Sequence, residues 1–184
     1  MDALTLLAHR NSISRLSEPG PDNAALTEMI SCALRAPDHG YLRPWRFLVI
    51  SGDSRQRLGE LFARALIQRK PEASADQIEK NRNAPLRAPV IIAVIGQIHS
   101  HPKVPALEQT LSAGCAAFAL VLAAEALGFG AIWRTGDNAY DEQIKQGLGL
   151  TANDSVIGYI YIGTPATTPK VIPRLDPNDF IQRW

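Results

Sequence analysis

The spacing of apolar residues along this chain predicts alternating helices and strands. Apolar positions that recur every three or four residues, as in a helix, occur over residues 2–8, 24–34, 54–69 and 105–127, with a shorter helix expected near 75–82. Short continuous apolar runs, typical of buried strands, occur over residues 46–50, 89–96, 131–133 and 156–162. Taken alone, this alternation is compatible with a doubly wound parallel sheet.

Two segments predict that the fold extends beyond one chain. Helix 105–127 is rich in alanine and leucine on nearly every face, so we expect it to be buried all round. The tail 168–184 carries apolar residues without a regular period, so it needs an external surface to cover. Two arrangements satisfy this pattern: a helix buried in its own monomer beside a disordered tail, or a homodimer with the helix at its centre.

Length and charge narrow the class of protein. With 184 residues and 46% hydrophobic content, we expect one domain over residues 1–184 with a substantial core. A formal net charge of +1 argues against a general binder of nucleic acid or membrane surfaces. No apolar run approaches the roughly 20 residues of a membrane span, and the N-terminus lacks the pattern of a signal peptide. We therefore expect a cytoplasmic protein without nucleic-acid or membrane partners.

The cysteines and histidines do not form a metal-binding pattern. Cys32 and Cys115 lie in apolar helical contexts, where a buried free thiol is the expected state. The sequence has no C-x-x-C pair and only four scattered histidines. Of these, His99 and His101 follow a predicted strand without a partner motif and are expected to be loop residues. No metal site is predicted.

Two short segments carry the candidate binding chemistry. Four potential cations lie within twelve positions between a predicted helix and a predicted strand: Arg35, His39, Arg43 and Arg46. Such a loop suits a flat anionic ligand, although a solvated connection has the same composition. The second segment offers the forked guanidinium groups and the hydroxyl that bind phosphate: Arg10, Ser12 and Arg15.

An ordered set of motifs accompanies these segments. In chain order they are Met-Asp-Ala-Leu at the start, Arg-Ala-Pro-Asp-His39, Pro-Trp-Arg-Phe47, Lys-Val-Pro105, Ser-Ala-Gly-Cys115, Gly-Phe-Gly-Ala-Ile-Trp-Arg-Thr-Gly136 and Gly-Tyr-Ile-Tyr-Ile-Gly-Thr-Pro165. Together they resemble the FMN-dependent nitroreductase family, specifically its small YdjA-like branch. The resemblance implies an α+β fold with a central, mostly antiparallel sheet flanked by helices, in place of the parallel sheet. It also implies an intertwined homodimer with two FMN sites at its interface.

The resemblance also assigns cofactor-binding residues. On the phosphate and ribityl side it places Arg10, Asn11 and Ser12, although many relatives carry a second arginine at the position of Asn11. From the other subunit it brings Arg35 and His39, in a loop that in the wider family usually carries a serine and an asparagine. It places the backbone of Trp133, Arg134 and Thr135 near flavin N5, and it matches Arg174 to a C-terminal phosphate-binding motif. As an aromatic, Trp133 is also expected to belong to the core, like Trp45.

The implied activity is that of an NAD(P)H-dependent flavoenzyme. FMN would take hydride from NAD(P)H and pass it, in a ping-pong cycle, to a nitroaromatic, a quinone or a similar small-molecule acceptor. Such a cycle needs no catalytic side chain, and the sequence shows no Ser/His/Asp or Cys/His arrangement. Two alternatives stay open: a non-catalytic protein that binds or sequesters flavin, and a flavin reductase or reductive enzyme acting on an unknown metabolite.

Overall fold

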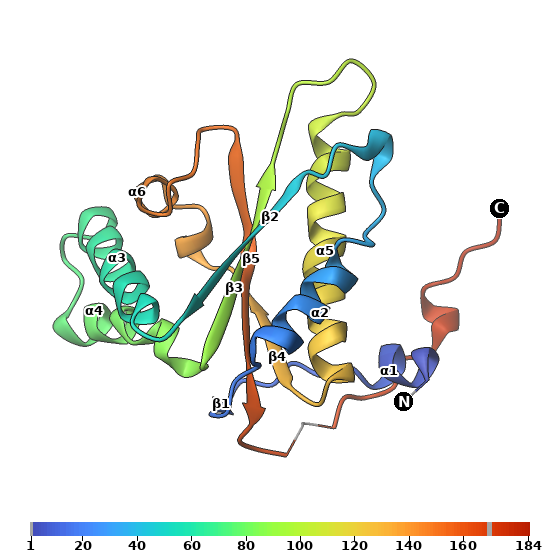
Figure 1. Ribbon diagram of the computed structural model, residues 1–184, viewed down its shortest axis with the longest axis horizontal. Helices are drawn as coiled ribbons and strands as arrows, with labels where there is room; N and C mark the ends of the chain where they lie inside the picture. The colour runs from blue at the N-terminus through green and yellow to red at the C-terminus, as the bar shows by residue number, and fades with distance from the viewer. Residues whose placement is uncertain (1, 169–170) are drawn as a thin grey trace.

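The structure, a computed structural model, describes residues 2–168 and 171–184. A central sheet lies between two helical layers (Figure 1). Its strands are β1 (Leu16–Ser17), β2 (Trp45–Ser51), β3 (Val90–Gln97), β4 (Gly130–Arg134) and β5 (Asp154–Pro165). Strand β3 pairs with β2 and β5, and β1 and β4 each pair with β5. Every pairing is antiparallel, which confirms the α+β fold implied by the resemblance and not the parallel sheet.

The helices agree closely with the apolar pattern. They are α1 (Ala3–His9), α2 (Asn23–Ala33), α3 (Ser54–Arg69), α4 (Ala75–Arg82), α5 (Ala106–Ala126) and α6 (Glu142–Gly147). Short 3₁₀ turns are η1 (His39–Tyr41), η2 (Ala84–Arg87), η3 (Asp137–Ala139) and η4 (Pro177–Asp179). The pattern did not predict β1, α6 or the 3₁₀ turns, because segments of two to six residues show no measurable period.

Alternate residues of β3 face two separate hydrophobic cores. Val90, Ile92 and Val94 pack with residues of α2 and α5, whereas Ile91 and Ala93 pack with residues of α3 and α6. Figure 1 shows the same division, with α2 and α5 on one side of the sheet and α3, α4 and α6 on the other. A strand covered on both faces has no polar side, which explains the continuous apolar run in the sequence.

Helix α5 is buried on one face only, so the expectation of burial all round is wrong for the single chain. Its buried face includes Ala113 and Ala117, whose small side chains pack into the chain's own core. The other face is an apolar stripe open to solvent, formed by Leu107, Leu111, Gly114, Cys115 and Phe118. Cys32 and Cys115 are free but exposed, which corrects the expectation that both thiols are buried.

Helix α5 is also long and apolar enough, by length and composition, to cross a membrane, contrary to the prediction from the sequence. Nine of its residues are buried, and seven of these belong to the core that α5 shares with the strands and α2, which is typical of a core helix. At its start, the fully buried side chain of Gln109 holds the loop that contains His99 and His101. The Gln109 amide accepts from His99 N at 2.9 Å and donates to His99 O at 2.8 Å.

Candidate functional site

The first predicted segment is fixed to the C-terminal end of α5. The backbone N–H of Asn11 donates to Glu125 Oε2 at 3.2 Å, and the N–H of Ile13 donates to the carbonyl of Ala131 at 2.9 Å. The side chain of Arg10 is half-buried and that of Ser12 is exposed. Within the described residues, no hydrogen bond or ion pair joins the Arg10 guanidinium to the protein, so it is available to an anion.

The second predicted segment is fixed to the opposite end of α5. His39 Nδ1 lies 2.6 Å from Glu108 Oε2, and Ser112 Oγ donates to the carbonyl of Pro37 at 2.5 Å. The Asp38 carboxylate accepts from the backbone N–H groups of residues 42 and 43, at 3.1 and 2.8 Å. Arg35 is exposed and follows Leu34, the C-cap residue of α2.

The backbone of this second loop is strained. Tyr41 and Arg43 have φ angles of 55° and 52°, in the left-handed region that residues with a side chain rarely adopt. Tyr41 is nevertheless 86% exposed. Strain of this kind persists only where surrounding contacts enforce it, and it is concentrated at functional sites.

Helix α5 therefore separates the two segments. Glu108 and Glu125 lie near its two ends, about 25 Å apart at 1.5 Å per residue. The single chain consequently does not bring Arg10 and Ser12 together with His39.

The third predicted segment ends the edge strand β4. Trp133 is 36% exposed, so it is not the core residue that was expected, whereas Trp45 is buried as predicted. The Nε1 of Trp133 donates to the carbonyl of Ile157 at 3.2 Å. A Cβ at Gly158 would collide with this indole, so glycine is needed there for the ring to lie across β5.

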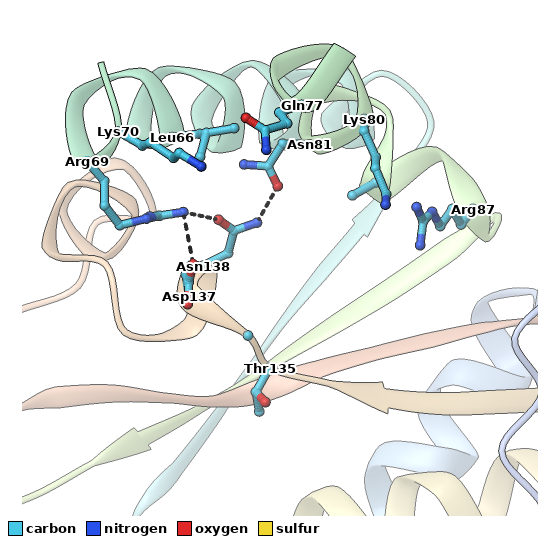
Figure 2. Close-up of a pocket in the computed structure, with 12 residues that line it drawn as sticks. Leu66, Arg69, Lys70, Gln77, Lys80, Asn81, Arg87, Thr135, Asp137 and Asn138 are labelled. Carbon is cyan, nitrogen blue, oxygen red and sulfur yellow. Dashed lines mark hydrogen bonds and ion pairs between the residues drawn. The ribbon is translucent and has the colours of Figure 1, made fainter. Parts of the chain in front are cut away.

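Arg134 lies on the opposite face of β4. Its guanidinium carbon is 5.7 Å from the ring centroid of Tyr161, and its buried Nε has no hydrogen-bond partner among the described residues. Burial raises the pKa of Tyr161, although Arg134 and Arg87 act in the other direction. Thr135 follows at the exposed rim and lines a pocket (Figure 2).

A hydrogen-bond chain holds the loop after β4 in place. Asn138 Nδ2 donates to Asn81 Oδ1 at 3.0 Å, and Asn81 Nδ2 donates to the carbonyl of Phe62 at 3.0 Å. Tyr159 donates its hydroxyl to the carbonyl of Asn138 at 3.1 Å. Arg69 Nη2 lies 3.5 Å from Asn138 Oδ1 (Figure 2). These positioning residues carry no motif and were not predicted from the sequence.

The C-terminal prediction, Arg174, lies in the segment 171–184, all of which is exposed. Within the described residues, no hydrogen bond or ion pair joins Arg174 to another side chain. The tail runs outward past α1 in Figure 1, with Phe180 at 72% exposure and Ile181 at 60%. Among the described residues there is also no cluster of His, Cys, Asp or Glu that could hold a metal ion.

Comparison with known proteins places these features in one family. The sequence model of the Nitroreductase family matches residues 7–164. "Putative NAD(P)H nitroreductase YdjA" of Escherichia coli K12 is 41% identical over 184 residues, which cover 98% of each chain. A nitroreductase-like family protein from Bacillus cereus superimposes with a TM-score of 0.87 at 18% identity, covering 100% of this chain and 96% of the other.

A further solved structure shows the same fold. It is the FMN-dependent nitroreductase NfnB from Mycobacterium smegmatis in complex with NADPH. Its TM-score is 0.77 at 17% identity, and the match covers 99% of this chain and 97% of the other. At this identity the superposition is a statement about the fold alone.

Proposed function

The chain belongs to the nitroreductase family, and we propose that it is an FMN-dependent oxidoreductase that oxidises NAD(P)H and reduces a nitroaromatic, a quinone or a similar acceptor. The observation that carries this proposal is that, within the described residues, the Arg10 guanidinium, the Ser12 hydroxyl and the buried Nε of Arg134 have no hydrogen-bond or ion-pair partner. The relative of 41% identity is named for NAD(P)H nitroreductase activity, and a structural neighbour was solved with NADPH and named FMN-dependent.

The chemistry of the three segments fits FMN. A dianionic phosphate needs cations and hydroxyls, and Arg10 and Ser12 offer these without a partner among residues 2–168 and 171–184. Trp133 presents a partly exposed indole edge, and the buried Nε of Arg134 has no acceptor among the described residues. A buried donor without an acceptor destabilises the protein, so a ligand atom that accepts a hydrogen bond from this Nε would remove that penalty.

When bound, FMN supplies the hydride chemistry, so the protein needs no nucleophile. We assign binding and orientation to the side chains: Arg10, Asn11 and Ser12 toward the phosphate and ribityl chain, and Arg35 and His39 from the other subunit. The backbone of Trp133, Arg134 and Thr135 borders the reactive edge, and Arg174 is a further phosphate ligand. In the proposed ping-pong cycle the donor leaves before the acceptor enters the same pocket.

We further propose that each site is built at the interface of a homodimer. Two observations support it: the apolar stripe on α5 is open in the single chain, and the two anchored segments lie at opposite ends of this helix. A twofold contact through the stripe would cover apolar surface and bring the far end of a second α5 toward each Arg10. A cytoplasmic location is part of the proposal and rests on the sequence.

Flavin analysis and turnover test this function. The purified protein should be yellow, and the supernatant after acid precipitation should contain FMN. Steady-state oxidation of NADH and NADPH, measured over a panel of nitroaromatic and quinone acceptors, should show parallel double-reciprocal lines, as a ping-pong cycle requires. Bound FMN without turnover would favour a flavin-sequestering protein, and FAD or no flavin after reconstitution would contradict the proposal.

A further inference from the structure

A cationic pocket lies beside the loop that follows β4. It has a volume of about 450 Å³, within the range of small-molecule sites. Its walls come from the end of α3, from α4, from η2 and from residues 135–138 (Figure 2). The charged residues that line it are Arg69, Lys70, Lys80, Arg87 and Asp137.

Within the part of the chain that the structure describes, ion pairs match the charge of only one of the four cations, Arg69. Arg69 lies 2.5 Å from an Asp141 carboxylate oxygen and 3.8 Å from one of Asp137. These two carboxylates balance its charge, and the ion pairs hold the loop after β4 in place. Lys70, Lys80 and Arg87 form no ion pair within the described residues. Although the formal net charge of the chain is only +1, three positive charges without an ion-pair partner among the described residues line this one pocket.

This pocket is distinct from the segment assigned to the FMN phosphate. That segment contacts β4 at Ala131, through the N–H of Ile13. Thr135, on the pocket rim, lies four residues further along, roughly 13 Å at 3.3 Å per residue. The pocket therefore adjoins the end of β4 that we assign to the reactive edge of the flavin.

From this placement we infer that the pocket binds the phosphate groups of the nicotinamide dinucleotide donor. The inference rests on the proposed function and identifies the part of the site that recognises NAD(P)H. Among the reactants of that function, nitroaromatics and quinones need carry no charge, whereas the donor carries a diphosphate and, in NADPH, a third phosphate. Anchored there, the donor could reach past Thr135 with its nicotinamide. The walls are already fixed by the Asn81–Asn138 hydrogen bond, so little ordering is required on binding.

Kinetics with two donors test the inference. The variants are Lys80→Gln, Arg87→Gln and the double variant, and Arg64→Gln, which removes an exposed charge elsewhere on α3, is the matched control. The probes are NADPH, NADH and the phosphate-free donor 1-benzyl-1,4-dihydronicotinamide, each with the neutral acceptor menadione. We expect KM for NADPH to rise about threefold per single variant and roughly tenfold for the double variant, as for partly exposed cations. KM for the phosphate-free donor and the FMN content should stay unchanged.

Calorimetry supplies a readout independent of turnover. ADP-ribose, which has the donor's diphosphate but no nicotinamide, should bind the FMN-loaded parent. It should bind the double variant about tenfold more weakly, and its affinity for the parent should fall as ionic strength rises.

The alternatives give different results. Equal increases in KM for both kinds of donor, or loss of FMN, would place these cations in the flavin site and overturn the inference. A change confined to the anionic acceptor 4-nitrobenzoate would assign the pocket to acceptors instead. An active, FMN-loaded parent that does not bind ADP-ribose would overturn the inference alone, whereas a parent without flavin or NAD(P)H oxidation would overturn the proposed function as well.

Discussion

The two ends of α5 carry segments of similar chemistry that are anchored in different ways. At the C-terminal end, the 10–12 segment is held through its backbone, and the Arg10 guanidinium has no partner among the described residues. At the N-terminal end, the 35–43 segment is held through the side chains of Asp38 and His39 and has strained φ angles at Tyr41 and Arg43.

This difference suggests a division of roles. The segment around Arg10 keeps its charged side chain available, as a phosphate ligand should. The loop around His39 is instead held in one conformation by its own side-chain contacts, as expected of a loop that contacts a ligand bound to the other subunit. Because about 25 Å of helix separates them, a single ligand can contact both only if they belong to different chains.

The largest expected effect comes from a charge placed on the open stripe of α5. In the single chain a Cβ at Gly114 meets nothing within 4 Å, and glutamate favours the helix more than glycine does. Gly114→Glu should therefore fold as a monomer yet bury an unpaired charge in the dimer, at a cost of about 3–5 kcal/mol. Sedimentation and flavin content, measured on one sample, should show a monomer with little FMN.

Gln68→Glu, on the exposed side of α3, is the control for that variant and should leave the dimer and its flavin intact. A Gly114→Glu monomer with full FMN occupancy would show that each site is complete within one chain.

The next effect concerns the free guanidinium at the C-terminal end of α5. Arg10→Ala removes a charge-assisted hydrogen bond to a dianionic phosphate, worth roughly 1.5–3 kcal/mol, so FMN affinity should fall about ten- to a hundredfold. Fluorescence titration of the apoprotein with FMN measures this change. Unaltered affinity would move the phosphate site away from this segment, with Arg174 the next residue to test.

A smaller effect is expected at the anchored loop. Glu108→Gln keeps the shape of the side chain but removes the charge that faces His39, and exposed pairs of this kind contribute about 0.2–1 kcal/mol. FMN affinity should weaken about two- to threefold, with no change for Glu72→Gln on the α3–α4 connection. A loss as large as that of Arg10→Ala would mean that Glu108 itself contacts the cofactor.

Apolar spacing predicted the long elements because burial imposes a period on them. It could not predict strand direction: β3 is covered on both faces, so its sequence resembles that of a parallel strand although its neighbours are antiparallel. The motifs located the candidate site residues. The residues that position them, such as Glu125 and Asn138, have no local pattern, because their partners are distant in sequence.

The central claim, that each FMN site takes Arg10 from one chain and Arg35 from the other, is tested most directly by a mixed dimer. An Arg10→Ala chain and an Arg35→Ala chain, carrying different tags, would be co-expressed and their heterodimer isolated by sequential affinity steps. In a shared-site dimer one site receives both substitutions and the other receives neither. The account predicts one tightly bound FMN per heterodimer, with both variant homodimers depleted of flavin. A heterodimer as poor in flavin as those homodimers would contradict it.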